Sequence, residues 1–398
     1  MSQPTALENL LVLDLTRILA GPYCTMLLGD FGARVIKIEE PSRGDETREY
    51  GPPFTARGAS AYYLAVNRNK QSVTLNLKST AGIEILRALA RRADILVENF
   101  RVGTMDAWGI GYADLRALNP RLIYCAITGY GQTGPDKDRP GVDTIIQAQG
   151  GIMSITGPAN GEPYKVGVAI ADITAGMNAA IAILAALYHR DQTGAGQFID
   201  LSLFDSQLGW LANVASAYLV SGAEPKRYGN AHATVVPYQL MSTRDGAVML
   251  GVATDRQFQA LCKIINRDAW ATDARFATNA ARVVQRAELI SELEKIFRAR
   301  STAEWMADLV RAKIPCGPVN DIPTALAEPQ TIARAMVQTI ELDGEKIKMI
   351  GPVPKFSRTP ARIALAPPRL GEQTDLVLRE LLQYDDAQIA QLRAAGTI

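Results

Sequence analysis

The chain has 398 residues, and its 42 lysines and arginines nearly balance its 41 aspartates and glutamates, which leaves a formal net charge of +1. This balance provides no long-range field for nucleic acid or an anionic membrane, so partners recognised by overall charge are excluded. An anionic ligand would have to be met by local basic residues. The length exceeds what one hydrophobic core usually holds and predicts two or three folding units.

The four cysteines are far apart and form no C-x-x-C pair: Cys24, Cys125, Cys262 and Cys316. Such spacing argues against a zinc site or a disulfide framework and is typical of a reducing cytoplasm. The first residues lack the basic segment and apolar run of a signal peptide. The longest apolar helix candidate, residues 175–188, is too short for a bilayer. We therefore expect a cytoplasmic protein with no membrane contact and no bound metal.

The first half alternates strand and helix patterns. Expected strands are residues 10–15, 34–39, 72–77, 94–98 and 122–127, and expected helices are residues 21–30 and 80–92. A helix from Asp172 to about residue 190 and a strand over residues 197–203 continue the series. Strands separated by helices predict βαβ units, a parallel sheet and helices on both of its faces.

The pattern changes after about residue 220. Two short strands (235–242 and 247–252) and three helices (255–266, 286–299 and 302–312) predict a smaller α+β domain. Strand-like residues 337–342 and 346–350, a Pro-rich segment and one last amphipathic helix follow. The first strand-to-helix turn, residues 16–22, has no G-x-G-x-x-G, and the chain has no P-loop. An NAD dehydrogenase or a kinase is therefore disfavoured.

The chain has only two histidines, which leaves little room for a catalytic triad or a metal cage. His189 falls near the end of a predicted helix, where a structural capping role is favoured. His232 lies in a loop, and the alternatives of a site residue and a loop hydrogen-bonding residue remain equally open.

Asp172 follows an apolar run and directly precedes a predicted helix. On local sequence alone the favoured interpretation is a plain N-cap, which accepts a hydrogen bond from a free N–H group. The functional alternative is a nucleophile whose oxyanion is stabilised by the same donors. With an ordinary pKa of about 3.9, such a carboxylate would be ionised at neutral pH and need no base.

Three loops follow or precede predicted strands at one edge of the sheet. Residues 129–135 (GYGQTGP) are Gly-rich, and residues 66–72 (VNRNKQS) carry Arg68 and Lys70. Residues 66–72 are interpreted either as a solvated turn or as a phosphate clamp formed by Arg68 and Lys70. Residues 97–100 (VENF) end the fourth strand. Ligands of open α/β sheets bind at such an edge.

At these positions the chain resembles the class III CoA-transferase family, which includes carnitine and formyl-CoA transferases. The matching stretches run in order from about residue 8 to residue 376: LDLTRILAGP, GARVIKIEEP, VNRNKQSVTLNL, ADILVENF, ITGYGQTGP, ADITAG, TGAGQFIDLSLFD, RYGNAHATVVPYQ, IPCGPVND and PPRLGEQTD. Ten matching stretches in the same order are specific for this family. They favour the nucleophile over the N-cap interpretation of Asp172.

The resemblance implies a large α/β domain over residues 1–222, a small domain over 223–328, and a return to the large domain over 329–398. It also implies an interlocked homodimer whose substrates are acyl-CoA and a carboxylic acid, with no permanently bound cofactor. The acyl-carrying aspartate falls on Asp172, which would pass through a mixed anhydride and an aspartyl-CoA thioester. Implied CoA contacts are Ala20, Asn67, Arg68, Asn69, Lys70, Asn99, Phe100, Thr128, Gly129, Tyr130 and Gly131.

Departures from the family pattern narrow the activity. Leu19 stands where oxalate-using members carry Gln, which disfavours oxalate chemistry. An arginine that those enzymes use for CoA falls on Ala107, so Arg101 is expected to substitute for it. The related α-methylacyl-CoA racemases need a histidine at the position of Val142, and valine can be neither acid nor base.

Within the family, the stretches resemble the succinyl-CoA:glutarate type most. A dicarboxylate needs a cation for its far carboxylate, and Arg17, Arg48 and His232 are the candidates. Two alternatives remain, a racemase and a non-catalytic acyl-CoA-binding protein. The presence of Asp172 argues against the second, because a binder needs no nucleophile.

Overall fold

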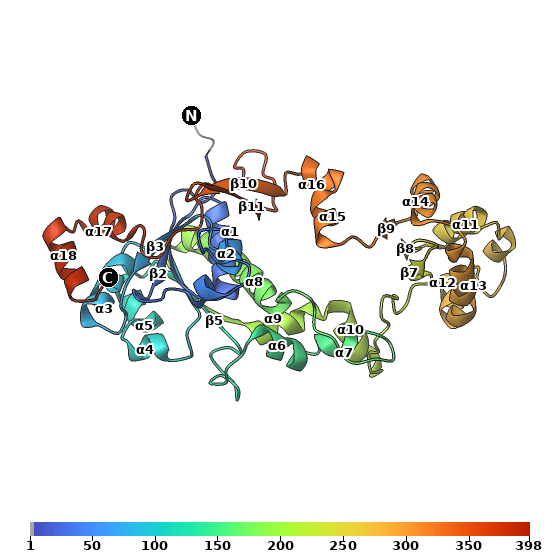
Figure 1. The fold of residues 1–398 in the computed structure, drawn as a ribbon. Coiled ribbons are helices and arrows are strands. Elements are labelled where there is room, and N and C mark those ends of the chain that lie inside the picture. The colour runs from blue at the N-terminus through green and yellow to red at the C-terminus, as the bar shows by residue number, and fades with distance from the viewer. Residues whose placement is uncertain (1–3) are drawn as a thin grey trace. The chain divides into compact units, whose positions relative to one another are not determined.

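The computed structural model describes residues 4–398 (Figure 1). The chain divides into two compact units. The first comprises Met1–Ile152, Lys165–Gly222 and Gln330–Ile398, and the second comprises Met153–Tyr164 and Ala223–Pro329. The grouping of Met153–Tyr164 with the second unit was not foreseen from the sequence.

Six parallel strands form the sheet of the first unit, in the order β3-β2-β1-β4-β5-β6. They are β1 (Leu11–Leu15), β2 (Arg34–Glu39), β3 (Lys70–Thr74), β4 (Ile95–Glu98), β5 (Ile123–Thr128) and β6 (Phe198–Ser202). Strand β1 is central, since Val12 pairs with Val35 on one side and with Ile95 on the other. The predicted parallel sheet is confirmed, and its strand order is that of doubly wound nucleotide-binding folds.

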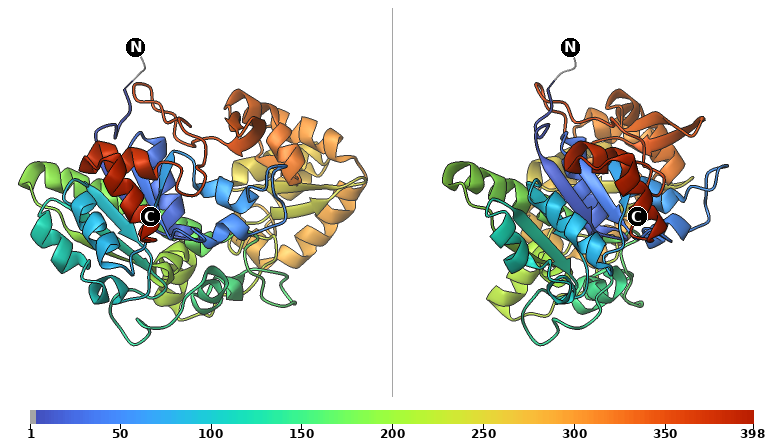
Figure 2. Two further views of the ribbon diagram at one scale, coloured as in Figure 1. Left: turned by 60° about the vertical axis from the view of Figure 1, so that its left-hand side comes forward. Right: turned by 90° about the vertical axis from the view of Figure 1, so that its left-hand side faces the viewer.

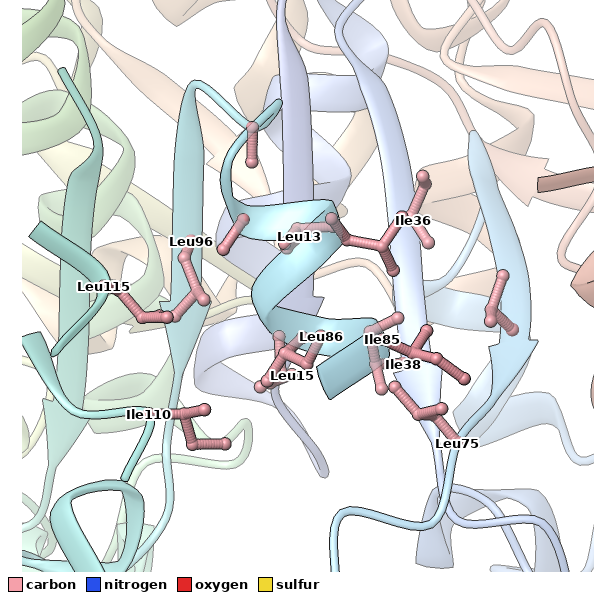
Figure 3. Close-up of a cluster of buried hydrophobic side chains, with 14 of the residues drawn as sticks. Leu13, Leu15, Ile36, Ile38, Leu75, Ile85, Leu86, Leu96, Ile110 and Leu115 are labelled. Carbon is pink, nitrogen blue, oxygen red and sulfur yellow. The ribbon is translucent and has the colours of Figure 1, made fainter. Parts of the chain in front are cut away.

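Alternate residues of each strand enter the two opposite cores, because side chains of a strand alternate between faces. Leu13 lies in a buried cluster with Ile85 and Leu86 of a covering helix (Figure 3). Its neighbour Val12 belongs to a second buried cluster that contains Ala175 of another helix. Both faces of the sheet are therefore covered, as the βαβ pattern predicts.

The helices of this unit, in chain order up to residue 222, are α1 (Ala20–Asp30), α2 (Ala61–Val66), α3 (Thr80–Ala90), α4 (Thr104–Ala107), α5 (Tyr112–Leu118), α6 (Asp143–Gln149), α8 (Ile170–Thr193), α9 (Leu203–Trp210) and α10 (Ala212–Ser221). A 3₁₀ turn spans Glu46–Glu49. Only α1, α3 and α8 of these were predicted. Helix α8 is 24 residues long, so the prediction that the apolar segment is too short for a bilayer is wrong. Half of its apolar window is buried, and it packs against α1 and α9.

The end of the chain returns to the first unit. Strands β10 (Val337–Leu342) and β11 (Glu345–Ile350) form an antiparallel hairpin. Two helices follow, α17 (Thr374–Leu382) and α18 (Asp386–Ala394), where a single helix was predicted. Helix α17 packs against β3 and α3, so the last residues lie beside early strands (red and blue in Figure 2).

The second unit is built on an antiparallel sheet with the order β7-β8-β9, and the predicted α+β character is confirmed. Its strands are β7 (Tyr238–Ser242), β8 (Ala247–Gly251) and β9 (Cys316–Pro318), and its helices are α11 (Asp255–Ile264), α12 (Asn279–Val284), α13 (Arg286–Arg298), α14 (Thr302–Arg311) and α15 (Ile322–Ala327), with a 3₁₀ turn at Asp268–Ala271. Phe297 and Trp305 stack in its core at 4.2 Å between ring centroids. The short helices α7 (Ile152–Ile155) and α16 (Pro329–Ala333) lie where the chain passes between units.

Candidate active site

A cavity of about 540 Å³ opens in the first unit, at the carboxyl ends of β1, β4 and β5. It is lined by residues 17–20, 99–102, 127–129 and 137–142, together with Asp172 and Leu203. The structure thus brings eight of the predicted site residues to one place: Arg17, Ala20, Asn99, Phe100, Arg101, Thr128, Gly129 and Asp172. This is the edge where open α/β sheets bind ligands.

Asp172 occupies the third position of α8 and does not cap it, so the N-cap interpretation is wrong. The N-cap residue is Ala169, which offers no side-chain acceptor. Asp143, at the start of α6, supplies that acceptor from another element: its Oδ1 accepts the N–H of Ala171 at 2.9 Å and that of Asp172 at 3.4 Å. The start of α8 is therefore satisfied without the Asp172 side chain, which remains free for chemistry.

The ionisation of Asp172 departs from the sequence expectation. Burial raises its pKa to about 7, and the negative charge of Asp143 adds to the rise. Only about half of the Asp172 carboxyls are then ionised at neutral pH. The expectation of an unperturbed, fully ionised carboxylate is wrong, because the helix start does not compensate for the loss of solvent.

Helices α1 and α8 approach closely beside Asp172. Gly176, one turn after Asp172, has no side chain, and a Cβ there would lie 2.5 Å from the carbonyl oxygen of Ala20. This contact between backbones brings the start of α1 next to the first turns of α8, and both Ala20 and Asp172 line the cavity.

Tyr62 of α2 is a neighbour of Asp172 that sequence reasoning missed. Burial, followed by the negative charge of Asp172, raises the pKa of Tyr62 to about 12. Its ring packs edge-on against Tyr50, with 5.5 Å between centroids. The sequence signal for it was the pair Tyr62 and Tyr63 after the capping residue Ser60, but such a pair is equally typical of a helix that packs in the core.

The turn after β1 carries Arg17 into the cavity. Asn99 accepts the N–H of Arg17 at 2.9 Å and donates to its carbonyl oxygen at 2.8 Å, so the backbone is fixed on both sides. The Arg17 guanidinium pairs with Glu46 at 2.6 Å and lies 5.2 Å from the ring centroid of Phe100. It is about two-fifths exposed and within reach of a ligand.

The Gly-rich loop after β5 begins and ends at two glycines in backbone contact. A Cβ on Gly141 would lie 2.6 Å from the Cα of Gly129, so only glycine fits there. Gly131 has a φ of 89° and donates its N–H to the Thr128 hydroxyl at 2.9 Å. The predicted contacts Tyr130 and Gly131 lie in this loop but do not line the cavity.

The loop contributes basic residues that sequence reasoning missed. Lys137 and Arg139 line the cavity, and Arg139 also lies over the ring of Tyr130 at 5.5 Å. The dense charges of GPDKDRPG were the available signal, although such runs are usually solvated turns. Arg101 lines this cavity and a neighbouring one of about 150 Å³, which Glu98 and Tyr124 also line.

The phosphate-clamp interpretation of residues 67–70 is not supported. The side chains are buried and paired within the fold: Asn67, Arg68, Asn69 and Lys70. Arg68 forms a two-pronged ion pair with Asp30 at 2.6 and 2.8 Å. Lys70 pairs with Asp14 at 3.0 Å and is fully enclosed. These cations balance buried carboxylates, and neither of them lines the cavity that contains Asp172.

Two predicted carboxylate anchors also lie elsewhere. Arg48 donates to both oxygens of Glu39, at 2.7 and 2.9 Å, to the hydroxyl of Tyr63 at 2.6 Å and to the carbonyl oxygen of Pro368 at 3.1 Å, so four of its five donors are already used. His232 belongs to the second unit, where its ring stacks on Tyr238 and its Nδ1 accepts the N–H of Thr234. Within residues 4–398 no group of three or more His, Cys, Asp or Glu is placed to hold a metal ion.

Comparisons with known proteins identify the family of the chain. A family model described as CoA-transferase family III matches residues 7–374. Succinyl-CoA:glutarate CoA-transferase of Homo sapiens is 42% identical over 399 residues, which cover 100% of this chain and 91% of the relative. Succinate--glutarate CoA-transferase of Agrobacterium fabrum is 44% identical over 386 residues, which cover 94% and 95%.

A solved structure agrees as well. The crystal structure of a CAIB/BAIF family protein from Brucella suis matches with a TM-score of 0.85 and 43% identity, and covers 95% of this chain and 100% of that one. Because these similarities extend over nearly the whole sequence, the chain belongs to CoA-transferase family III and is a CoA-transferase.

Proposed function

We propose that the chain transfers CoA from succinyl-CoA to a dicarboxylic acid through covalent intermediates on Asp172. The observation that carries the proposal is a buried carboxylate with a raised pKa inside the cavity at the strand ends. Groups whose pKa is shifted by burial and a charged neighbour are frequent at catalytic sites. The two relatives named above act, by their names, on succinyl-CoA or succinate and on glutarate.

The steps balance without a further reagent. The Asp172 carboxylate attacks the thioester carbonyl of succinyl-CoA, which gives a mixed anhydride and CoA thiolate. The thiolate then attacks the aspartyl carbonyl, which releases succinate and leaves an aspartyl-CoA thioester. The acceptor carboxylate attacks that thioester and forms a second anhydride, and the released thiolate attacks its acceptor carbonyl. Asp172 is regenerated, and the acceptor leaves as its CoA thioester.

The raised pKa of Asp172 suits this chemistry. A more basic carboxylate is a better nucleophile, and about half of it is ionised at neutral pH. Asp143 accepts the N–H groups of Ala171 and Asp172, so those donors do not hydrogen-bond to the Asp172 carboxylate and do not lower its basicity.

CoA is assigned to the cavity and its neighbour. Arg101, Lys137 and Arg139 provide cations for its phosphate groups, since guanidinium and ammonium groups bind phosphate strongly. Arg101 lines both hollows and so links them into a site for an elongated ligand. Arg101 keeps its predicted role, and Lys137 and Arg139 take the place of Arg68 and Lys70 as assigned basic contacts.

Arg17 is assigned to the far carboxylate of the dicarboxylate. Of the three candidate anchors it alone lines the cavity. Its partner Glu46 is partly exposed and competes with the ligand for the guanidinium. Acceptors that differ by one methylene are expected to differ by only about 1–3 kcal/mol in binding, so several acids of similar length should react.

The proposal includes a homodimer and a cytoplasmic location. Helix α8 exposes an apolar stripe with helical spacing, Met177, Ile181, Leu184 and Tyr188, which suits burial against a second copy of the chain. The four cysteines are all free, which suits a reducing compartment.

The test is a turnover assay with succinyl-CoA and a panel of dicarboxylic acids, in which new acyl-CoA thioesters are measured by mass spectrometry. We expect glutaryl-CoA to form, and Asp172→Ala to abolish it. Asp191→Asn, at the exposed far end of α8, is the matched control and should keep activity. Retained transfer in Asp172→Ala would reject Asp172 as the nucleophile, and epimerisation of a 2-methylacyl-CoA without transfer would favour a racemase.

A further inference from the structure

The turn between β1 and α1 forms one wall of the cavity and is strained. Arg17, Ile18 and Leu19 of this turn line the cavity that contains Asp172. Ile18 has a φ of 70°, which lies in the left-handed region. A β-branched residue rarely adopts this conformation, because its Cβ crowds the following carbonyl group. Such a residue persists only where its surroundings hold it.

Side chains from distant parts of the sequence supply that hold. Asn99 binds both the N–H and the carbonyl oxygen of Arg17. Asp45 accepts the N–H of Ile18 on its Oδ1, at 3.3 Å. The same oxygen is fixed by the N–H and the hydroxyl of Thr47, at 3.0 and 2.7 Å. The strained peptide is therefore tied to a rigid acceptor.

A buried lysine completes the arrangement. Lys37 of β2 donates to the carbonyl oxygen of Thr16 at 2.8 Å and pairs with the Oδ2 of Asp45 at 2.9 Å. Both side chains of this pair are completely buried. Lys37 and Asp45 thus join the two ends of the strained segment, Thr16 and Ile18, through a single ion pair.

Neither Lys37 nor Asp45 lines the cavity, so neither can touch a substrate. A buried ion pair is also a weak source of stability, since well-packed apolar residues often stabilise as much. The geometry has a more specific consequence: the Oδ1 of Asp45 accepts the N–H of Ile18 while Ile18 is in the left-handed conformation.

We propose that Asp45, fixed by Lys37, is a positioning residue for CoA transfer: it holds Ile18 in the left-handed conformation, so that the turn presents Arg17 and the start of α1 to the cavity. The kinetic consequence rests on the proposed function. The structural consequence, that the turn loosens without Asp45, does not depend on it.

The first test compares Asp45→Asn with the parent enzyme in the transfer of CoA from succinyl-CoA to glutarate. We expect kcat to fall about 100-fold, the effect of a displacement of about 1 Å in a catalytic wall. Adding Ile18→Gly to Asp45→Asn should restore at least about tenfold of this loss, because glycine adopts a positive φ without an anchor. A purely structural role predicts no such recovery.

The matched control is Asp94→Asn. Asp94 also accepts a backbone N–H, from Leu11 at 2.9 Å, and pairs with the buried Arg190 at 3.0 Å, but it does so at the amino ends of the strands. This variant should unfold at a lower temperature and keep the parent kcat. If Asp45→Asn does not fold, the double variant Lys37→Gln/Asp45→Asn replaces it, because it leaves neither member of the buried ion pair without its partner. Its kcat is then compared with that of the same double variant carrying Ile18→Gly.

Amide hydrogen exchange of the peptide that contains residues 16–19 provides a readout independent of activity. In Asp45→Asn we expect this peptide to exchange at least about tenfold faster while peptides of β4 and β5 stay protected. Unchanged exchange, or a double variant no more active than Asp45→Asn, would overturn the inference. A parent enzyme that transfers CoA to no acid would refute the proposed function instead, and the exchange rates would still decide whether Asp45 holds the turn.

Discussion

Replacing Asp143 by Asn removes a negative charge beside Asp172 and keeps an oxygen that can accept the N–H of Ala171. Burial is the larger cause of the raised pKa of Asp172, and the charge of Asp143 is the second. In the variant, Asp172 should therefore titrate below about 7 but still well above its ordinary value of 3.8. We expect its pKa to fall by about 1 unit, which is typical of one nearby charge.

The assay is the dependence of kcat/KM on pH between about pH 5 and 9. Activity should rise with pH because only ionised Asp172 attacks, and the rise should move to lower pH in Asp143→Asn. At pH 6 the ionised fraction would grow from about one tenth to about one half, a gain of about fivefold. Tyr62, which also faces Asp172, titrates near 12 and does not interfere.

Asp138→Asn is the control, since Asp138 lines the same cavity and does not contribute to the raised pKa of Asp172. The reasoning is refuted if the rise of kcat/KM occurs at the same pH in Asp143→Asn as in the parent enzyme, or if both variants shift it to lower pH equally.

Three further predictions concern Asp172, Arg17 and Gly141. Folded Asp172 keeps its proton up to about pH 7, whereas the unfolded group loses it near 3.8, so stability falls as pH rises between these values. Asp172→Asn should therefore stabilise the fold by about 2–4 kcal/mol at pH 8 and by little at pH 4 in urea unfolding, and an equal gain at both would contradict the buried charge. Arg17→Ala should raise KM for glutarate about tenfold to a hundredfold, with Arg17→Lys intermediate, and an unchanged KM would place the anchor elsewhere. Gly141→Ala should force the loop away from Gly129 and raise KM for succinyl-CoA about tenfold, whereas Gly209→Ala, at an open helical position without a positive φ, should change it less.

The sheet could be predicted because each strand is a short apolar run and each crossover helix has an apolar face. Strand β2 begins and ends at the predicted residues, and the others shift by one to three. Helices α9 and α10 were missed because they follow β6 with no loop signal between them. The N-cap interpretation of Asp172 failed because α8 begins two residues earlier, and its start is satisfied by Asp143 from α6.

The site could be predicted in part. The resemblance placed Asp172, Asn99 and the turn at Arg17 in one region, and the cavity contains all three. Arg17 and Arg101 line the cavity as predicted, but Arg48, Arg68 and Lys70 do not, because a sequence does not show which cations balance buried carboxylates. Lys70 pairs with Asp14 across 56 positions of sequence, and that pairing appears only in the fold.

The most direct test of the central claim is mass spectrometry of the intact protein after reaction with succinyl-CoA, with hydroxylamine as a trap and peptide mapping to locate the product. We predict a CoA adduct, or a hydroxamate after trapping, on the peptide that contains Asp172, and none in Asp172→Asn. Transfer of CoA to glutarate with no adduct on that peptide at any time would contradict the covalent mechanism.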